Sequence, residues 1–308
     1  MKKLFAVLAA LGLAAAVAGA QSLNEAKEAF NNGVTAMETS KTEALAQFRS
    51  AYEMALKCTE EEDAPEFIGT CKTAITGALL SIAKEQINEA AYDEALATLK
   101  EAKATAADFE QEEVISEVND LIPNVYMRKG STLLKNKDFA GATEAFKDVI
   151  SLKADDAQAF LLLGQAQLQA GIMDAAIEAL TKANELGESN ATKLLSTTYL
   201  KQGQALMKAG KNAEAIDAFE KSNSFVESGN AYLLMANALT KTGKSAKSIE
   251  AYKKYLELSP NAKNAADIIF TIAATAQKAG DKATAKEYYG KLAGTKYAEQ
   301  AAAQLKSL

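Results

Sequence analysis

The chain has no histidine and no tryptophan, and only two of its basic residues, Arg49 and Arg128, are arginines. The lack of histidine excludes Ser-His-Asp and Cys-His catalysis and the common zinc sites. With two arginines and a formal net charge of −6, the sequence also lacks the basic stripe that is typical of nucleic-acid binders. We therefore expect no enzyme activity, no metal or cofactor, and no nucleic-acid partner.

Long apolar runs are absent except at the start of the chain. Lys2 and Lys3 precede the run FAVLAALGLAAAVAG, which leads into the small-residue triplet Ala18-Gly19-Ala20. This pattern is typical of a signal peptide with an A-x-A cleavage site. A retained anchor is the alternative, but the run is too short and too rich in alanine to favour spanning roughly 30 Å of hydrocarbon. We predict a signal peptide over residues 1–20 and an exported bacterial protein, periplasmic or secreted, without stable membrane insertion.

Cysteine is scarce as well, since Cys58 and Cys71 are the only two. In an exported protein an even pair favours a disulfide, and two separate thiols are the alternative. The bond would close the segment CTEEEDAPEFIGTC and contribute about 3 kcal/mol by the chain-entropy argument. Because no C-x-x-C motif is present, we predict a structural rather than a redox disulfide.

Alanine, leucine, lysine and glutamate are abundant and prolines number three, which favours helix throughout. A small-large-small motif recurs with spacings of four and then three, which places its three residues on one helical face. From Ala142 onward successive copies begin 34, 39, 33 and 37 residues apart, and the earlier copies are separated by insertions. The seven copies are Ala44–Phe48–Ala51, Ala95–Leu99–Ala102, Ala142–Phe146–Val149, Ala176–Leu180–Ala183, Ala215–Phe219–Ser222, Ser248–Tyr252–Tyr255 and Ala285–Tyr289–Leu292.

A second amphipathic helix precedes each copy and carries a small residue at a similar offset. These residues are Gly33, Ala83, Gly130, Gly164, Gly203, Ala236 and Ala273. Glycine inside a helix costs about 1 kcal/mol relative to alanine, so a compensating contact is required. We predict that Gly164 and Ala176 lie where the two helices approach closely. The turns between the helices contain Gly171, Gly210, Gly243 and Gly280, which favours a left-handed helix end.

With these features the chain resembles the tetratricopeptide repeat family, arrays of helix-turn-helix units of about 34 residues. The resemblance covers nearly the whole mature chain and is strongest from Tyr126 to Pro260. Gly164, Ala176 and Pro260 match the small residue of the first helix, the alanine of the second and the terminal proline. The family's frequent tryptophan is replaced by Tyr126, Phe160, Tyr199 and Tyr232.

The resemblance implies an all-α, right-handed superhelical solenoid of about seven units with a C-terminal capping helix. We assign residues 21–122 to degenerate units with the cysteine loop, 123–295 to five better-matched units, and 296–308 to the capping helix. The segment DFEQEEVISEVNDLI before Pro123 is expected to extend a first helix, kinked or restarted at the proline.

Three short motifs imitate known sites. Gly243-Lys244-Ser245 lacks the first glycine of a phosphate-binding loop, because Ala238 stands there. Ser81-Ile-Ala-Lys84, Ser228-Gly229-Asn230 and Lys241-Thr242-Gly243 imitate the three motifs of the penicillin-recognising serine enzymes. In those enzymes the last motif sits on a strand, whereas here it is expected at a helix end, so we interpret the likeness as chance. The acidic run at 60–63 does not have calcium-loop spacing and is interpreted as solvated.

In the resembled family the first helices line a concave groove that holds a partner. At the corresponding positions Met127, Leu161, Leu200, Leu233 and Phe270 form an apolar stripe, flanked by Asn124, Gln158, Gln165, Gln204, Asn230 and Asn237. Charges are scarce among these residues, and the family's lysine and arginine clamp for a C-terminal carboxylate is missing. The stripe suits an amphipathic helix or an extended apolar segment. The alternative is that neighbouring helices or the capping helix cover it.

We therefore predict a non-enzymatic protein–protein interaction scaffold of the bacterial envelope that binds another envelope protein in this groove. The alternative function, from a different class, is a structural component that self-assembles, so a homo-oligomer stays open.

Overall fold

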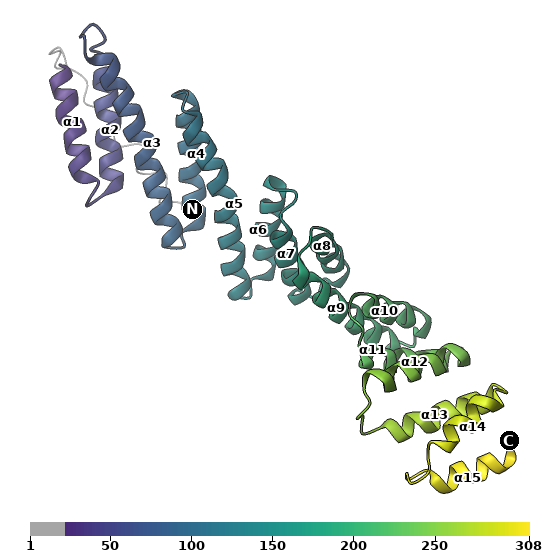
Figure 1. Cartoon of the computed structure of the whole chain (residues 1–308). Helices are drawn as coiled ribbons and strands as arrows, with labels where there is room; N and C mark the ends of the chain where they lie inside the picture. Colours follow the sequence, from purple (N-terminus) through teal and green to yellow (C-terminus); the bar gives the residue numbers. More distant parts are fainter. Residues whose placement is uncertain (1–21) are drawn as a thin grey trace. The chain divides into compact units, whose positions relative to one another are not determined.

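The computed structural model describes residues 22–308. These residues form fifteen α-helices and no strand (Figure 1). The helices belong to two compact units: unit 1 ends at Tyr126, and unit 2 runs from Met127 to Leu308. The predicted signal peptide lies outside the described residues. None of the helices within 22–308 is both long and apolar enough to cross a membrane.

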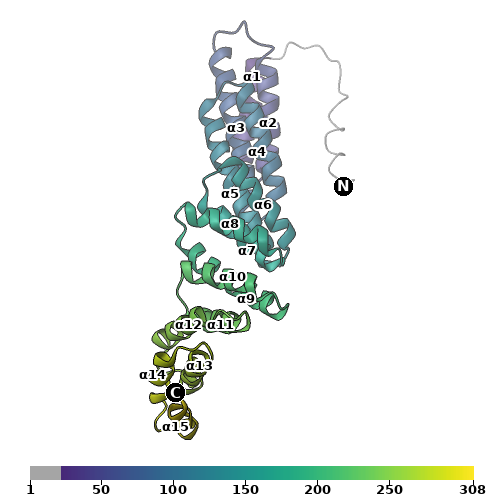
Figure 2. The ribbon, with the colours of Figure 1, turned by 90° about the vertical axis from the view of Figure 1, so that its right-hand side faces the viewer.

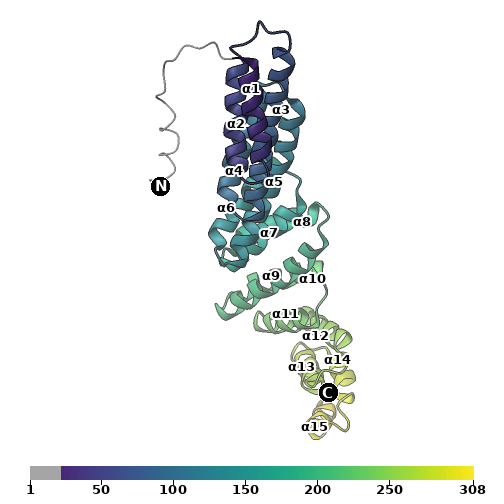
Figure 3. The same cartoon turned by 90° about the vertical axis from the view of Figure 1, so that its left-hand side faces the viewer.

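Unit 1 contains α1 (Leu23–Ala36), α2 (Lys41–Ala55), α3 (Ala64–Asn88), α4 (Tyr92–Asp108) and the first part of α5 (Glu112–Lys135). Consecutive helices from α1 to α4 pack side by side, as Figures 2 and 3 show from two sides. Its main core joins side chains of α2, α3, α4 and α5, with Phe48, Leu79, Leu99 and Val118 among its buried members.

Unit 2 starts within α5 and continues through helices that pair in chain order. These are α6 (Phe139–Leu152), α7 (Ala157–Gln169), α8 (Met173–Glu185), α9 (Ser189–Lys208), α10 (Asn212–Phe225), α11 (Gly229–Lys241), α12 (Ser245–Leu258), α13 (Ala265–Lys278), α14 (Lys282–Gly290) and α15 (Ala298–Ser307). The prediction of an all-α array of about seven helix pairs with one further helix is confirmed.

Several helices begin where the sequence supplies a capping side chain. Ser22 and Glu25 form a reciprocal capping box at the start of α1. The carboxylates of Asp138 and Asp156 accept the backbone N–H groups of Gly141 and Ala159 at the starts of α6 and α7. Within α5, helical structure continues through Pro123 from Glu112 to Lys135, so the chain does not restart a helix at this proline.

The repeated motif forms the interior of each helix pair. Phe146, Leu180 and Phe219, the large residues of three copies, are fully buried. A Cβ atom added to Gly164 would lie 2.6 Å from Leu180 Cγ, and one added to Gly203 would lie 2.5 Å from Phe219 Cε1. The predicted close approach at Gly164 is therefore confirmed, because no side chain fits between the helices there.

The turns inside several helix pairs contain a residue with a positive φ angle. Gly171, Gly210, Gly243 and Gly280 have φ angles between +74° and +81°, which confirms the predicted left-handed helix ends. Ala90, at the corresponding turn of unit 1, adopts φ +60° without being glycine. Lys137 does the same in unit 2 with φ +64°, so these two turns are strained relative to the four that contain glycine.

The predicted disulfide is wrong for this structure, because Cys58 and Cys71 are not bonded to each other. Cys58 packs beside Ala64, the first residue of α3, whereas Cys71 lies seven residues further along that helix and packs against Ala51. Seven helical residues rise about 10 Å, so α3 carries Cys71 away from the loop. A disulfide requires Cα atoms within about 7 Å of each other.

Candidate protein-binding face

The predicted groove residues lie on the first helices of their pairs, and their exposure differs. Asn124, in unit 1, and Gln158 and Asn230, in unit 2, are exposed. Leu161 is buried at 3% exposure and packs with Leu180 and Leu195. The other predicted residues are half-buried: Met127, Gln165, Leu200, Gln204, Leu233, Asn237 and Phe270.

The apolar members of the predicted stripe make contacts within unit 2. Leu200 and Leu233 pack against the core shared by α10 to α14, and Met127 packs against the core around Phe146. These packing contacts explain why the side chains are half-buried. Each of them therefore presents only part of its surface to a partner.

At α13 the first-helix surface is occupied by the end of the chain itself. The ring of Tyr297 stacks on Phe270 with 4.6 Å between centroids, and Lys296 Nζ lies 2.5 Å from Asp267 Oδ1. The hydrogen bonds from Lys296 and Tyr297 lower the pKa of Asp267. Gln277 donates to Gln304 of α15 at 2.9 Å. The segment before and within α15 thus covers Phe270.

Two amides on the first helices are oriented by tyrosines of the second helices. The hydroxyl of Tyr252 donates to Asn237 Oδ1 at 2.7 Å, and that of Tyr289 donates to Gln277 Oε1 at 2.8 Å. Burial raises the pKa of both tyrosines, so the hydroxyls keep the protons that they donate. Each amide is therefore held in one orientation.

A hollow of about 470 Å³ opens where α5, α7 and α9 meet. It includes Gln165 from the predicted set, together with Leu134 and Leu168, which continue the same helical faces. Sequence reasoning did not place Phe139 and Leu194 beside them. Two lysines, Lys135 and Lys137, complete the lining with Gln169, and no carboxylate contributes to it.

Charge is scarce at the predicted groove positions but not next to them. From Met127 to Lys241 the first helices, α5, α7, α9 and α11, contain seven basic residues and no aspartate or glutamate. We call their exposed sides the first-helix face. Its exposed basic residues are Arg128, Lys135, Lys193, Lys201, Lys208 and Lys241. The second helices of the same pairs, α6, α8, α10 and α12, carry ten acidic residues.

The six exposed basic residues named above have no carboxylate partner among residues 22–308. Four of the six lysines on α6, α8, α10 and α12 do form ion pairs; Lys147 and Lys182, for example, pair with Glu144 and Glu185 at 2.8 and 3.4 Å. On α9, residues 193, 201 and 208 follow one helical face because they are eight and seven residues apart. A charge count per helix, made after the helix pairs were aligned, would have found this signal in the sequence.

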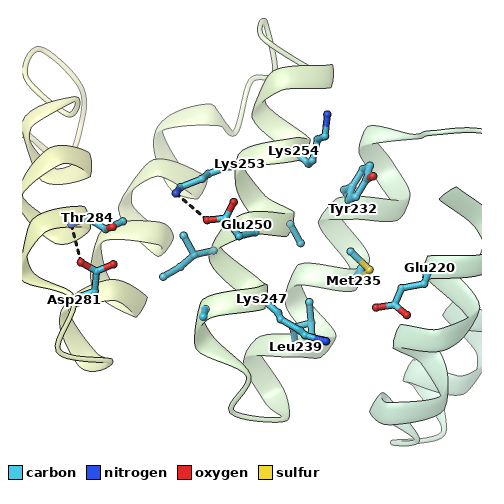
Figure 4. A pocket seen from close by; sticks show the side chains of 13 residues that line it. Glu220, Tyr232, Met235, Leu239, Lys247, Glu250, Lys253, Lys254, Asp281 and Thr284 are labelled. Atoms are coloured by element: carbon cyan, nitrogen blue, oxygen red, sulfur yellow. Dashed lines mark hydrogen bonds and ion pairs between the residues drawn. The ribbon is translucent and has the colours of Figure 1, made fainter. Parts of the chain in front are cut away.

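A second hollow, of about 440 Å³, lies on α12 and is lined by α10, α11 and α14 as well (Figure 4). Its floor is apolar and includes Met235, Leu239 and Ile249. Its rim carries charges of both signs, and Lys253 donates to Glu250 at 2.9 Å within it (Figure 4). The rim therefore does not select a ligand of one charge.

Within residues 22–308 no cluster of three or more histidine, cysteine, aspartate or glutamate side chains could hold a metal ion. The arrangement of the first helices instead offers apolar side chains, fixed amides and ammonium groups. Side chains of these three kinds are the ones with which peptide-binding surfaces recognise their ligands.

Comparison with known proteins finds a family match within unit 2. The family model described as "Tetratricopeptide repeat" matches residues 127–191 and 200–263. No curated protein sequence gives a significant match.

Among solved structures, a MamA protein is 25% identical over 55% of this chain and 88% of its own, with a TM-score of 0.36. A MamA protein of Desulfovibrio magneticus is 19% identical over 55% and 92%, with a TM-score of 0.34. YrrB, described as a TPR protein with an unusual peptide-binding site, is 16% identical over 60% and 91%, with a TM-score of 0.35.

Proposed function

We propose, from the premise that residues 127–191 and 200–263 belong to the tetratricopeptide repeat family, that this chain is a non-enzymatic scaffold for protein interaction. Its binding surface is the first-helix face of unit 2. The bound partner is a protein segment, helical or extended, that carries apolar side chains among carboxylates. The signal peptide that the sequence predicts at residues 1–20 supports a place in the bacterial envelope.

The uncompensated positive charge of the first-helix face carries this proposal. Exposed ammonium groups without a nearby carboxylate attract a negatively charged partner and raise its rate of association. Lys193 and Lys201 are separated by eight residues, or about 12 Å along α9. A segment with carboxylates at a similar spacing would meet both lysines.

The hollow at α5, α7 and α9 supplies the apolar part of the recognition. Leu134, Leu168 and Leu194 line it, so an inserted aliphatic or aromatic side chain would exchange water for apolar contact. Lys135 and Lys137 at the same hollow favour a carboxylate next to that side chain. The oriented amide of Asn237 can hydrogen-bond the backbone of the bound segment.

A binding measurement with a defined probe tests the proposal. The probe is a fluorescein-labelled helical peptide of glutamate and leucine, and the protein is the full chain without its leader. The test variant carries Lys193→Glu, Lys201→Glu and Lys208→Glu. The control carries Lys147→Glu, Lys182→Glu and Lys286→Glu, which change the charge equally on second helices.

We expect the test variant to bind the probe at least tenfold more weakly at low ionic strength, and the control to change by about twofold or less. The affinity of the unmodified chain should fall as salt is added, because the lysines are exposed. Equal weakening by the two triple variants would contradict a role for the first-helix face. No measurable binding by the unmodified chain would contradict the proposed partner chemistry.

A further inference from the structure

The two units carry opposite charge. Residues 22–126 contain 8 basic and 21 acidic residues, a formal net charge of −13. Residues 127–308 contain 24 basic and 19 acidic residues, a formal net charge of +5. One chain therefore holds both an anionic unit and a cationic unit.

The negative charge of unit 1 is concentrated in one segment. Between Lys103 and Arg128 the chain has six acidic residues and no basic residue. Of these, Glu117 is bonded to Lys84 at 2.8 Å. The other five are exposed and form no ion pair within residues 22–308: Asp108, Glu110, Glu112, Glu113 and Asp120.

Apolar side chains accompany these carboxylates. Val114 and Ile115 follow Glu112 and Glu113 in the first turn of α5, and both are half-buried. The segment from Asp108 to Asp120 therefore has the chemistry expected of a partner for the first-helix face: carboxylates next to partly accessible aliphatic groups. We call it the acidic segment.

We propose that the first-helix face of one copy binds the acidic segment of a second copy, so that the chain associates head to tail. This proposal rests on the proposed function, because it names an occupant of the same surface. The two surfaces are different patches, so the contact is heterologous and leaves one free patch at each end. Growth continues until a ring closes.

Charge complementarity favours a second copy over another polyanion. A nucleic acid or an anionic lipid surface would meet the positive face of unit 2, but unit 1 of the same chain would repel it. A second copy brings the negative charge of its acidic segment to the positive charge of the first-helix face, so one contact neutralises both. Its binding should therefore weaken strongly between low and physiological ionic strength.

Sedimentation velocity of the full chain without its leader tests the proposal. Three proteins are compared at low salt: the unmodified chain, the face variant (Lys193→Glu, Lys201→Glu, Lys208→Glu) and a segment variant (Glu110→Gln, Glu112→Gln, Glu113→Gln). The control variant carries Glu28→Gln, Glu53→Gln and Glu66→Gln, which change the charge of unit 1 equally at other exposed sites.

We expect the unmodified chain and the control to form dimers and larger species that dissociate as salt is added. The face variant and the segment variant should each associate at least tenfold more weakly. Their equimolar mixture should form a one-to-one complex that does not grow, because each copy retains one working patch. Misfolding of either variant cannot produce that result.

A chain that stays monomeric at low salt up to about 100 μM would overturn the inference, since specific interfaces of ordinary size bind more tightly. A mixture of the two variants that forms no complex, while the unmodified chain associates, would also overturn it. If the glutamate-leucine probe binds a monomeric unmodified chain, the proposed function stands and only the second copy is excluded. If the probe fails as well, both proposals fall.

Discussion

Units 1 and 2 bury the same small-large-small motif, but their formal net charges have opposite signs. Phe48 in α2 and Phe146 in α6 occupy the same place in the motif. A Cβ atom added to Gly33 would lie 2.7 Å from the ring of Phe48, and one added to Gly130 would lie 2.7 Å from the ring of Phe146. The surfaces nevertheless differ by eighteen formal charges. Buried positions are constrained by packing, whereas exposed charges change with little effect on stability. Repeats can thus keep one fold while their surfaces diverge.

The largest expected effect distinguishes a glycine at a close helix crossing, Gly164 in unit 2, from a glycine in open space, Gly77 in unit 1. Gly164→Leu should lower the free energy of unfolding by about 3 kcal/mol, because the new side chain meets Leu180 and forces the helices apart. Gly77→Leu in α3 is the matched control, because a Cβ there meets no atom within 4 Å. The control should stabilise unit 1 by up to about 1 kcal/mol through helix propensity. Urea unfolding followed by circular dichroism measures both, and equal effects would contradict the close approach.

The next effect concerns the thiols of unit 1. Burial raises the pKa of Cys71 to about 11, and burial together with Glu61 raises that of Cys58. Since the thiolate is the reactive form, native alkylation of Cys71 at pH 8 should be about a hundredfold slower than in the unfolded chain, and that of Cys58 should also be slower. In denaturant without reductant, mass spectrometry should find two alkyl groups added. Labelling only after reduction would show that the purified chain carries the disulfide that the structure lacks.

A smaller effect distinguishes a turn of unit 2 that contains glycine from a turn of unit 1 that does not. Gly171→Ala should destabilise unit 2 by about 1 kcal/mol, because alanine is strained at a positive φ. Ala90→Gly should stabilise unit 1 by a similar amount, because that residue already has φ +60°. Thermal unfolding of each variant tests the pair, and shifts of the same sign would contradict the comparison. Gly69→Ala, in a helical position with open space, is a control for composition.

The smallest effect comes from the charge of the units themselves. Salt screens the repulsion among the carboxylates of unit 1, so raising sodium chloride should slow hydrogen exchange more in unit 1 than in unit 2. We expect the opening free energy of unit 1 to rise by about a few tenths of a kcal/mol more than that of unit 2. The face variant at low concentration is suited to this measurement, because its copies are expected to associate only weakly with one another. Equal slowing in both units would show that the acidic surface does not strain unit 1.

Periodicity predicted most of the fold correctly because it reports which residues face inward. The small residues and their partners, such as Gly203 and Phe219, follow from spacing alone. The predicted disulfide was wrong because separation along the chain does not show that α3 begins before Cys71. The surface was only partly predictable, since Phe270 has groove spacing but is covered by Tyr297 from the chain end.

The repeat, the helix pairs and the glycine at each close crossing are predictable from the sequence, because they depend on local spacing and on the size of neighbouring side chains. The charge that each helix carries can also be counted in the sequence. The division of the helices between the two units, the covering of the stripe residues and the position of each hollow follow only from the folded chain. Those properties depend on contacts between residues far apart in the chain, such as Asp267 with Lys296, and no local pattern specifies them.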